Sequence, residues 1–374
     1  MISILASSSL PDGIEMTADI DGTIRRISYT AIGAGLEPSA DAAVAAMLMP
    51  AMSTRGPLVA QEPISPRLAA AIPKIQEILR SWEQRIPAYS RYAAVPVEAA
   101  VRQQLRSRPK RRVAAFFTGG VDSFYTVARH RDEIDMLVYV HGFDVRLDDS
   151  RFDELVITQL RLAAAALGKP LVEVWTNLRS VTDRYTDWTD YHGSALASVA
   201  LILASEFERI YIPATLTYAH LIPLGSHPLL DPLWSTEDVE IVHDGCEASR
   251  LDKLSAISDD VVARSHLRVC WKNRAGRYNC GSCEKCLRTM VALQALGVLH
   301  LFETFPDVVD PASIARTDLP EVRFTWEASL ALLKQTNGDP RLARALDRRL
   351  HSARARFVHG GIRVAYRVRD LMKG

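Results

Sequence analysis

Four of the five cysteines lie close together in the sequence, with a spacing that suits metal binding. Cys270, Cys280, Cys283 and Cys286 follow the pattern C-x9-C-x2-C-x2-C, and Gly281 permits a tight turn among them. Four thiolates around one Zn²⁺ ion make a structural site, because they leave no open position for water. Two alternatives stay open: an iron–sulfur cluster, which four thiolates also suit, and buried cysteines that bind no metal.

A second chemical feature is a glycine-rich turn. An apolar run at residues 113–117 passes directly into Thr118, Gly119, Gly120, Val121, Asp122 and Ser123. Two glycines let the backbone approach an anion closely, and the N–H groups that open a helix point at that anion. The hydroxyls of Thr118 and Ser123 add donors, while Asp122 caps the turn or acts through Mg²⁺ or water. The alternative is an ordinary strand-to-helix turn in which Asp122 or Ser123 caps the helix.

This turn lacks the GxxxxGK[ST] spacing of Walker A loops. It resembles the SGGxDS signature of the PP-loop ATP pyrophosphatase superfamily, with Thr118 in place of the first serine, and the resemblance covers residues 113–295. The resemblance implies that the loop holds the pyrophosphate part of ATP, which is split into AMP and pyrophosphate as a substrate oxygen is adenylated. It also implies that the adenine lies against the end of the second strand, at the backbone of Val140, His141 and Gly142.

The cysteine segment resembles the zinc-binding end of 7-cyano-7-deazaguanine synthases, which combine a PP-loop with a late four-cysteine site. Lys253 and Arg288 lie in segments where that family places cations. The resemblance therefore implies that these two cations, with Asp122 and Ser123, act in catalysis by stabilising charge on the splitting triphosphate. The first cysteine gap is longer here, and residues 1–100 and the basic C-terminal region have no counterpart in the family.

Several further polar residues could lie near a substrate. Residues 225–237 form a polar, Pro-punctuated segment after the fourth expected strand, and we expect either substrate contact or a packed loop anchored by Trp234. His192 opens a helix and is a candidate base, although a structural role is the simpler interpretation. Cys246 would be a reactive thiol in a sulfur-transferring enzyme, but a single cysteine is most often a small buried residue. We expect Arg250, Lys272 and Lys285 at the surface.

The elements that must position these residues alternate between strand and helix. The sequence predicts strands at residues 113–117, 136–140, 171–175 and 209–212, with helices at 122–130, 152–167 and 193–206 between them. Apolar strands separated by helices predict an α/β fold with a doubly wound parallel sheet, whose ligands bind at the carboxyl ends of the strands. The resemblance makes this sheet one of PP-loop (HUP-like) type.

The flanking regions differ in character. Residues 1–100 mix short alternating stretches with helical ones, so we expect a small α+β domain with a core of its own. Residues 101–112 are a basic linker. Residues 113–300 form the PP-loop domain, and residues 301–374 form a helical basic extension. Ten Lys and Arg stand against three Asp in residues 339–374. Each basic stretch is either a solvated face or a patch for RNA or polyphosphate.

The composition excludes several classes. The chain has 374 residues, a net charge of +1 and 48% hydrophobic residues, which excludes disordered and collagen-like proteins. No apolar run reaches the roughly 18 residues that span a bilayer, and the first residues lack a signal-peptide pattern. We therefore expect a cytoplasmic protein without a membrane partner.

Three functions fit these patterns. The first is a ligase that uses ATP and Mg²⁺ to adenylate a carboxylate or carbonyl oxygen of a small molecule before ammonia or an amine attacks. Ile2 follows Met1, so no N-terminal nucleophilic cysteine is expected, and ammonia would be free or come from a donor protein. The second is thiolation of a nucleobase or tRNA base, with a sulfur donor and RNA as partners. The third is a non-catalytic nucleotide- or RNA-binding zinc module. A homodimer is compatible with each.

Overall fold

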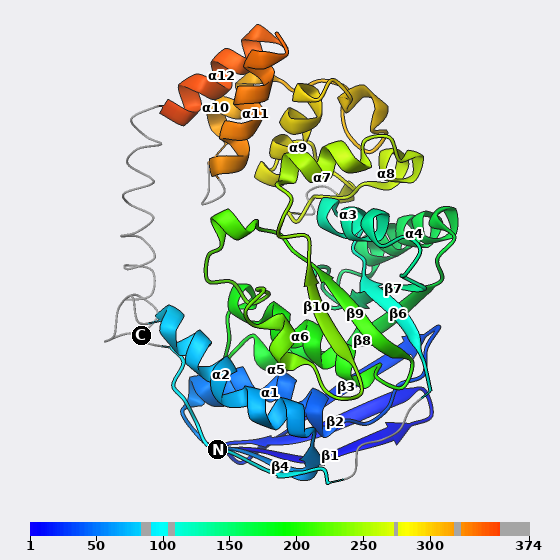
Figure 1. Cartoon of the computed structure of the whole chain (residues 1–374), viewed down its shortest axis with the longest axis vertical. Helices are drawn as coiled ribbons and strands as arrows, with labels where there is room; N and C mark the ends of the chain where they lie inside the picture. Colours follow the sequence, from blue (N-terminus) through cyan, green and yellow to red (C-terminus); the bar gives the residue numbers. More distant parts are fainter. Residues whose placement is uncertain (84–90, 104–108, 273–275, 318–322, 352–374) are drawn as a thin grey trace. The chain divides into compact units, whose positions relative to one another are not determined.

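The computed structural model describes residues 1–83, 91–103, 109–272, 276–317 and 323–351 (Figure 1). Its contacts divide the chain into two compact units. The first comprises Met1–Thr118 and Asp122–Glu247, and the second comprises Gly119–Val121 and the chain from Ala248 onward. The domain boundaries expected near residues 100, 112 and 300 stay predictions. Parts of both expected basic stretches, residues 104–108 and 352–374, lie outside the described residues.

The first unit contains a ten-stranded sheet with the strand order β10-β9-β6-β7-β8-β3-β2-β1-β4-β5. Five neighbouring strands are parallel: β6 (Arg112–Phe116), β7 (Met136–His141), β8 (Leu171–Thr176), β9 (Phe207–Pro213) and β10 (Glu240–Asp244). Numbered along the chain, these five strands have the order 3-2-1-4-5. This order is that of a doubly wound sheet, so the expected α/β class is confirmed.

Four of these five strands match the expected ranges to within two residues at each end. Their apolar runs are nearly continuous because helices cover both faces of a parallel sheet. The fifth strand, β10, was not expected. Its sequence, Glu-Ile-Val-His-Asp, has only two apolar residues, since it lies at the edge of the sheet.

The connecting helices begin and end where local signals place them. They are α3 (Val121–Arg129), α4 (Ser150–Leu167), α5 (Leu178–Thr182) and α6 (Trp188–Ile202). Gly168 ends α4 with a left-handed φ of 69°, as expected from its residue type. Helix α6 begins five residues earlier than expected, because the Asp187 side chain accepts a hydrogen bond from the backbone N–H of Thr189 and caps the helix.

The first hundred residues supply the other half of the sheet. They contain β1 (Ile2–Leu10), β2 (Gly13–Ile20), β3 (Thr23–Ile32), α1 (Ala40–Thr54), β4 (Leu58–Ile64), α2 (Pro66–Glu83) and β5 (Val97–Val101). Strand β3 pairs antiparallel with β8. Ile4, Met47 and Val174 consequently belong to one buried cluster, so the expected separate core for this region is wrong.

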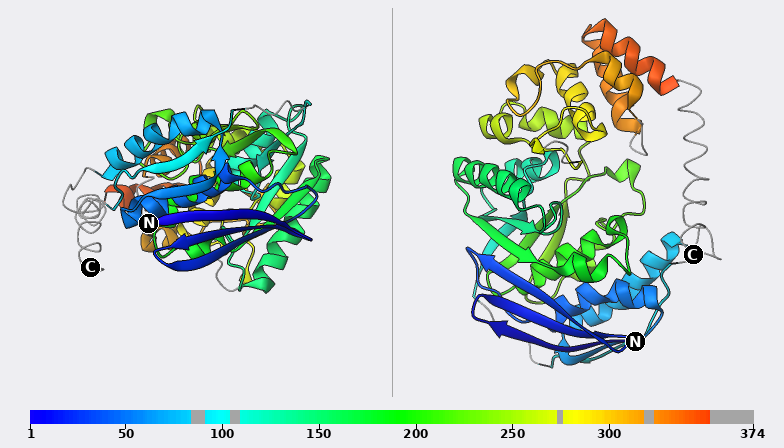
Figure 2. Two further views of the ribbon diagram at one scale, coloured as in Figure 1. Left: turned by 90° about the horizontal axis from the view of Figure 1, so that it is seen from below. Right: turned by 180° about the vertical axis from the view of Figure 1, so that it is seen from behind.

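The second unit is helical where it is described. It contains α7 (Arg250–Ile257), α8 (Val261–His266), α9 (Glu284–Ala295), α10 (Pro311–Arg316), α11 (Arg323–Gln335) and α12 (Pro340–His351) (Figure 2). Leu342, Leu346 and Leu350 are buried on one face of α12, as their helical spacing predicts. Among the described helices, none is both long and apolar enough to cross a bilayer.

Candidate functional site

The glycine-rich turn follows the strand at which the order of the parallel sheet reverses. Strand β6 has β7 on one side and β9 on the other, so the connections from β6 to β7 and from β8 to β9 run in opposite directions. In sheets of this kind, ligands bind at such a reversal, beyond the carboxyl ends of the strands. Thr118, Gly119 and Gly120 follow that end of β6 after one intervening residue, and Val121 begins α3.

The backbone of the turn explains its first glycine. Gly119 is buried and has a φ of 69°, in the left-handed region that side chains disfavour. Its carbonyl oxygen accepts a hydrogen bond from the backbone N–H of Arg268 at 2.8 Å. The helix that follows is nine residues long, and its first turn presents N–H groups that no partner within the helix can use. Asp122 is half-buried in this first turn, whereas Ser123 is only 4% exposed.

Helix α3 is held by polar bonds on its later turns. Thr126 donates a hydrogen bond to Asp244 at 2.8 Å, and the ring of His130 lies 2.9 Å from the same carboxylate. Tyr125 donates to Glu247 at 2.8 Å. Asp244 is the last residue of β10, so the helix is fixed to the sheet through a residue that sequence reasoning missed. The only signal for it was a lone acid at the end of a short apolar run.

In the segment expected to contact adenine, residues 140–142, the His141 side chain is buried and bonded within the core. The His141 ring contacts Asp153 at 2.7 Å and stacks on Trp175 with centroids 4.1 Å apart. Burial disfavours its charged form, but the hydrogen bonds with Asp153 and Glu173 outweigh burial and raise the pKa of His141. The imidazole of His141 is therefore engaged by core residues, and the side chain of Val140 is also buried in the core. Gly142 follows with a φ of 92°.

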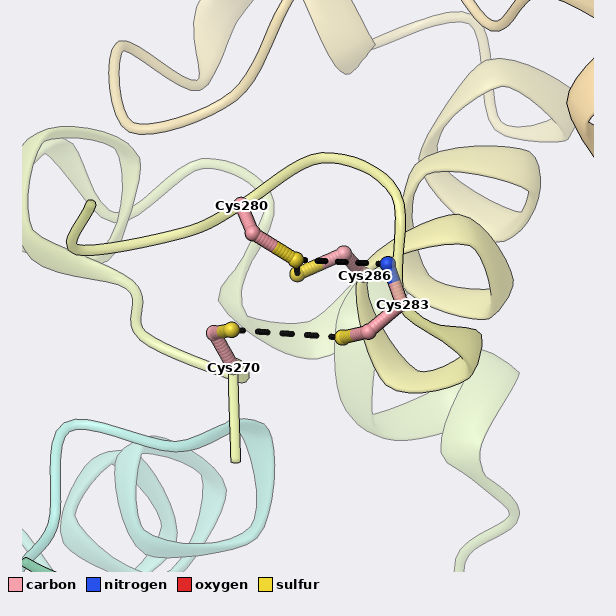
Figure 3. A group of neighbouring side chains, drawn as sticks. All are labelled: Cys270, Cys280, Cys283 and Cys286. Atoms are coloured by element: carbon pink, nitrogen blue, oxygen red, sulfur yellow. Dashed lines mark hydrogen bonds between the residues drawn. The ribbon is translucent and has the colours of Figure 1, made fainter. Parts of the chain in front are cut away.

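The four cysteines converge in the second unit (Figure 3). Their sulfur atoms all lie within 4.8 Å of one another. The sulfurs of Cys270 and Cys283 are 3.9 Å apart, and so are those of Cys280 and Cys286. A tetrahedral ion with metal–sulfur bonds of about 2.3 Å needs sulfurs about 3.8 Å apart. The geometry thus fits a single ion, because thiolates bound to several different irons would be spread more widely.

Local backbone features bring the sulfurs together. Gly281 has a φ of 68°, which makes the tight turn expected from its residue type, and Cys283 is the N-cap of α9. Asn279 clamps the first cysteine's segment to this turn. Its Oδ1 accepts hydrogen bonds from the N–H groups of Val269 and Cys270 at 2.9 and 3.1 Å, and its Nδ2 donates to the carbonyl of Leu267 at 2.8 Å. Nothing in the residue spacing marked Asn279 beyond its place next to Cys280.

The thiols share protons within the cluster. Hydrogen bonds from Cys283 and Cys286 lower the pKa of Cys270 well below its usual range. The bond to Cys270 raises the pKa of Cys283 to about 11, and the pKa of Cys286 is also raised. Burial disfavours the thiolate of Cys280, but hydrogen bonds from Ser282 and the backbone of Cys283 outweigh burial and lower its pKa too. The thiolate form is therefore favoured at Cys270 and Cys280, and binding of a metal would displace the remaining protons.

The two expected catalytic cations are buried in the same unit as Gly119 and the cysteines. Lys253 is 1% exposed on α7, a helix that Ser249 and Asp252 cap reciprocally. The Nε of Arg288 lies 3.2 Å from a carboxylate oxygen of Glu284 on α9.

The other basic residues near the cysteines differ in exposure. Arg250 is half-buried and donates a hydrogen bond to Thr289 at 2.9 Å, so it is not the surface residue that we expected. The Lys272 ammonium lies 4.0 Å from the ring centroid of Trp271, an exposed residue. Both Lys272 and Lys285 are exposed, as expected.

The loop at residues 225–237 belongs to the first unit and packs tightly. Trp234 is 1% exposed, as an anchor would be. The backbone N–H of Ser226 donates to Nε2 of His192 at 3.3 Å, and burial lowers the pKa of His192. His192 lies on α6, and a neutral imidazole that is hydrogen-bonded to this loop fits a structural role.

Cys246 is 1% exposed, so it is buried as we expected. Nearby His243 contacts the buried carboxylate of Asp231 at 2.7 Å. Burial disfavours the imidazolium, but the hydrogen bonds with Asp231 and Cys246 raise the pKa of His243 to about 9.

No protein-family model, curated protein or solved structure matches the chain. Function is therefore inferred from the residues and their geometry.

Proposed function

We propose that the protein is an ATP pyrophosphatase of PP-loop type that adenylates a carboxylate or carbonyl oxygen of a small molecule. The observation that carries this proposal is the place of the turn. Thr118, Gly119, Gly120, Asp122 and Ser123 follow the carboxyl end of the strand at which the 3-2-1-4-5 sheet reverses. That position, with two glycines and two hydroxyls, suits the binding of a polyphosphate. An ordinary strand-to-helix turn would need neither the second glycine nor both hydroxyls.

Each residue then has a distinct role. The backbone of the turn and the hydroxyls of Thr118 and Ser123 bind the β- and γ-phosphates of ATP. Asp122 holds Mg²⁺, directly or through water. The backbone of Val140, His141 and Gly142 faces the adenine.

Lys253 and Arg288 would offset the negative charge that develops as pyrophosphate leaves. Both are buried, so either would have to act from within the helical unit.

The reaction proceeds in two steps, adenylation of the substrate and then displacement of AMP. The substrate oxygen attacks the α-phosphorus, a P–O bond to that oxygen forms, and the bond to pyrophosphate breaks. Ammonia or an amine then attacks the activated carbon, and AMP leaves with the oxygen. Adenylation helps because it turns a poor leaving group into a phosphate ester, so the protein mainly orients the reactants and stabilises charge.

Zn²⁺ would have a structural role here. An all-sulfur set at tetrahedral distances leaves no ligand position for water or substrate, so the ion would fold the segment around the cysteines rather than take part in the reaction.

The products of ATP cleavage test the proposal. The protein is incubated with MgATP, ammonium and a panel of carboxylic acids and cyclic amides, and the nucleotide products are separated. We expect AMP and pyrophosphate in equal amounts with at least one substrate, and a loss of at least 100-fold in rate for Asp122→Ala. ADP and phosphate as products, or turnover that Asp122→Ala leaves unchanged, would contradict it.

A further inference from the structure

A groove in the second unit is lined by arginine side chains. It lies between α10 and α12 and has a volume of about 590 Å³. Helix α12 contributes Arg341, Arg344, Arg348 and Arg349, while α10 contributes the small side chains of Ala312 and Ala315. None of these residues belongs to the turn or to the cysteine cluster, so the groove is separate from the proposed ATP chemistry.

Three of the arginines form a row along one face of the helix. Arg341, Arg344 and Arg348 are spaced three and four residues apart, and all three are exposed. At a rise of about 1.5 Å per residue, the row extends over roughly 10 Å. The Nε of Arg344 donates to the carbonyl of Pro340 at 3.0 Å, which orients its guanidinium. Arg349 is 8% exposed, and its Nε donates to the carbonyl of Thr317 at 2.9 Å.

The acids near this row are used elsewhere. Asp347, the acid within α12, pairs with Lys334 of α11 at 2.7 Å. Asp339 accepts hydrogen bonds from backbone N–H groups at the start of α12, and Asp310 does the same for α10. Within the described residues, no carboxylate lies within 4 Å of the guanidinium nitrogens of Arg341, Arg344 or Arg348. Among the described residues, the positive charge of these three arginines is therefore not paired with a carboxylate.

The lining indicates what would occupy it. The charged residues of the lining are all arginine and the uncharged ones are alanine and proline, so an occupant must carry negative charge. The chain's own continuation, residues 352–374, carries six Lys and Arg against one Asp and would be repelled. Guanidinium forks match phosphate oxygens, and a row of them suits a linear series of phosphates rather than one compact anion.

We propose that the groove between α10 and α12 binds the phosphodiester backbone of a single RNA strand through Arg341, Arg344 and Arg348. Phosphates bind along the arginine row, and the small side chains of α10 let the strand approach closely. Among the described residues, no aromatic side chain lines the groove for base stacking, so binding depends on charge and little on sequence.

Fluorescence anisotropy with the full-length protein and a labelled 20-nucleotide RNA of mixed sequence tests this inference. The salt dependence of binding counts phosphate contacts, at a slope of about 0.7 per contact for single strands. We expect the triple variant R341Q/R344Q/R348Q to lower that slope by about 2 and to weaken binding at least tenfold. A matched control, R80Q/R131Q/R151Q, removes three exposed arginines from the first unit and should bind like the unchanged protein.

Several outcomes would overturn the inference. They are an unchanged protein that binds no RNA, equal losses in the two triple variants, and a groove variant with an unaltered slope. The inference would also be overturned if the protein bound a polyglutamate peptide or DNA but did not bind RNA. The substituted side chains are exposed, so thermal unfolding of both variants should match that of the unchanged protein. Failure of ATP turnover would not affect this result, because RNA binding is measured without ATP.

Discussion

The carbonyl oxygen of Gly119 accepts a hydrogen bond from the backbone N–H of Arg268 at 2.8 Å. Arg268 stands two residues before Cys270, and Asn279 ties the intervening N–H of Val269 to the cysteine turn. The glycine-rich turn is thus connected by backbone bonds to the segment that supplies the first sulfur. A metal in the cysteine cluster would therefore also order one side of the glycine-rich turn.

Removal of the metal should weaken nucleotide binding. Without an ion the segment before Cys270 becomes less ordered, and the loss of one backbone hydrogen bond, about 1 kcal/mol, corresponds to a roughly fivefold weaker affinity for MgATP. Calorimetry on the metal-loaded and the metal-free protein measures this difference. By linkage, MgATP should raise the affinity for the metal by the same factor. Equal MgATP affinities for the two forms, with both still folded, would show that the cluster and the loop are independent.

The cysteine cluster should bind one Zn²⁺ per chain. Cys286→Ser should lose the metal and lower the unfolding temperature, since a structural zinc supplies on the order of 10 kcal/mol to local folding. Cys246→Ala, the matched control, should keep one ion, because Cys246 is not part of the cluster. Elemental analysis and the absorption of the Co²⁺-substituted protein report ion content and tetrahedral sulfur ligation. Iron as the metal of the purified protein, or no metal after growth with zinc, would contradict a zinc site.

Asn279→Ala should loosen the site without removing a ligand. The substitution deletes two bonds to backbone N–H groups and one to the carbonyl of Leu267. Loss of such supporting bonds typically costs 10–100-fold in metal affinity, so we expect an effect of about that size in a chelator competition. Thr304→Val removes a single bond to the same carbonyl and should cost much less. Equal effects of the two substitutions would mean that Asn279 does not position Cys270.

Stability should fall in alkaline solution through His243. Its hydrogen bonds with Asp231 and Cys246 outweigh burial and raise the pKa of His243 from 6.5 to about 9, so the folded protein binds this proton more tightly than the unfolded chain. The stabilisation is complete below pH 6.5 and is lost as the pH rises through 9. At about 1.4 kcal/mol per pKa unit, the change amounts to about 3 kcal/mol.

Denaturant unfolding of the unchanged protein and of His243→Gln at several pH values measures this contribution. The gap in unfolding free energy between the two should shrink as the pH rises from 6 to above 9. His351→Gln, which changes an exposed histidine, should show no such trend. A constant gap for His243→Gln over that range would refute the assigned proton.

Much of the parallel sheet could be predicted, because strands that are buried on both faces consist almost entirely of apolar residues. Strand β7 is buried at every position, and its first five residues form a continuous apolar run. Edge strand β10 could not be found in that way, since only two of its five residues are apolar. The N-terminal strands join this sheet through the pairing of β3 with β8. That long-range contact could not be predicted, because it does not depend on any particular residue type.

The candidate site shows the same division. The clustering of Cys270, Cys280, Cys283 and Cys286 could be predicted because thiols at such short spacing suit one metal ion. The contact between Gly119 and Arg268 could not, because both partners are backbone groups that every residue carries. The burial of Lys253 and Arg288 could not be predicted from the sequence either, because charged residues are usually exposed unless they have buried partners.

Calorimetric titration with MgATP tests, without knowledge of the substrate, whether the turn at Thr118 and Ser123 holds the polyphosphate of ATP. We predict binding that pyrophosphate competes with, and an affinity at least tenfold lower for Thr118→Val combined with Ser123→Ala. Thr158→Val, which removes an exposed hydroxyl from α4, should leave the affinity unchanged. Absence of MgATP binding by the metal-loaded protein, or equal affinities for the double variant and the unchanged protein, would contradict the account.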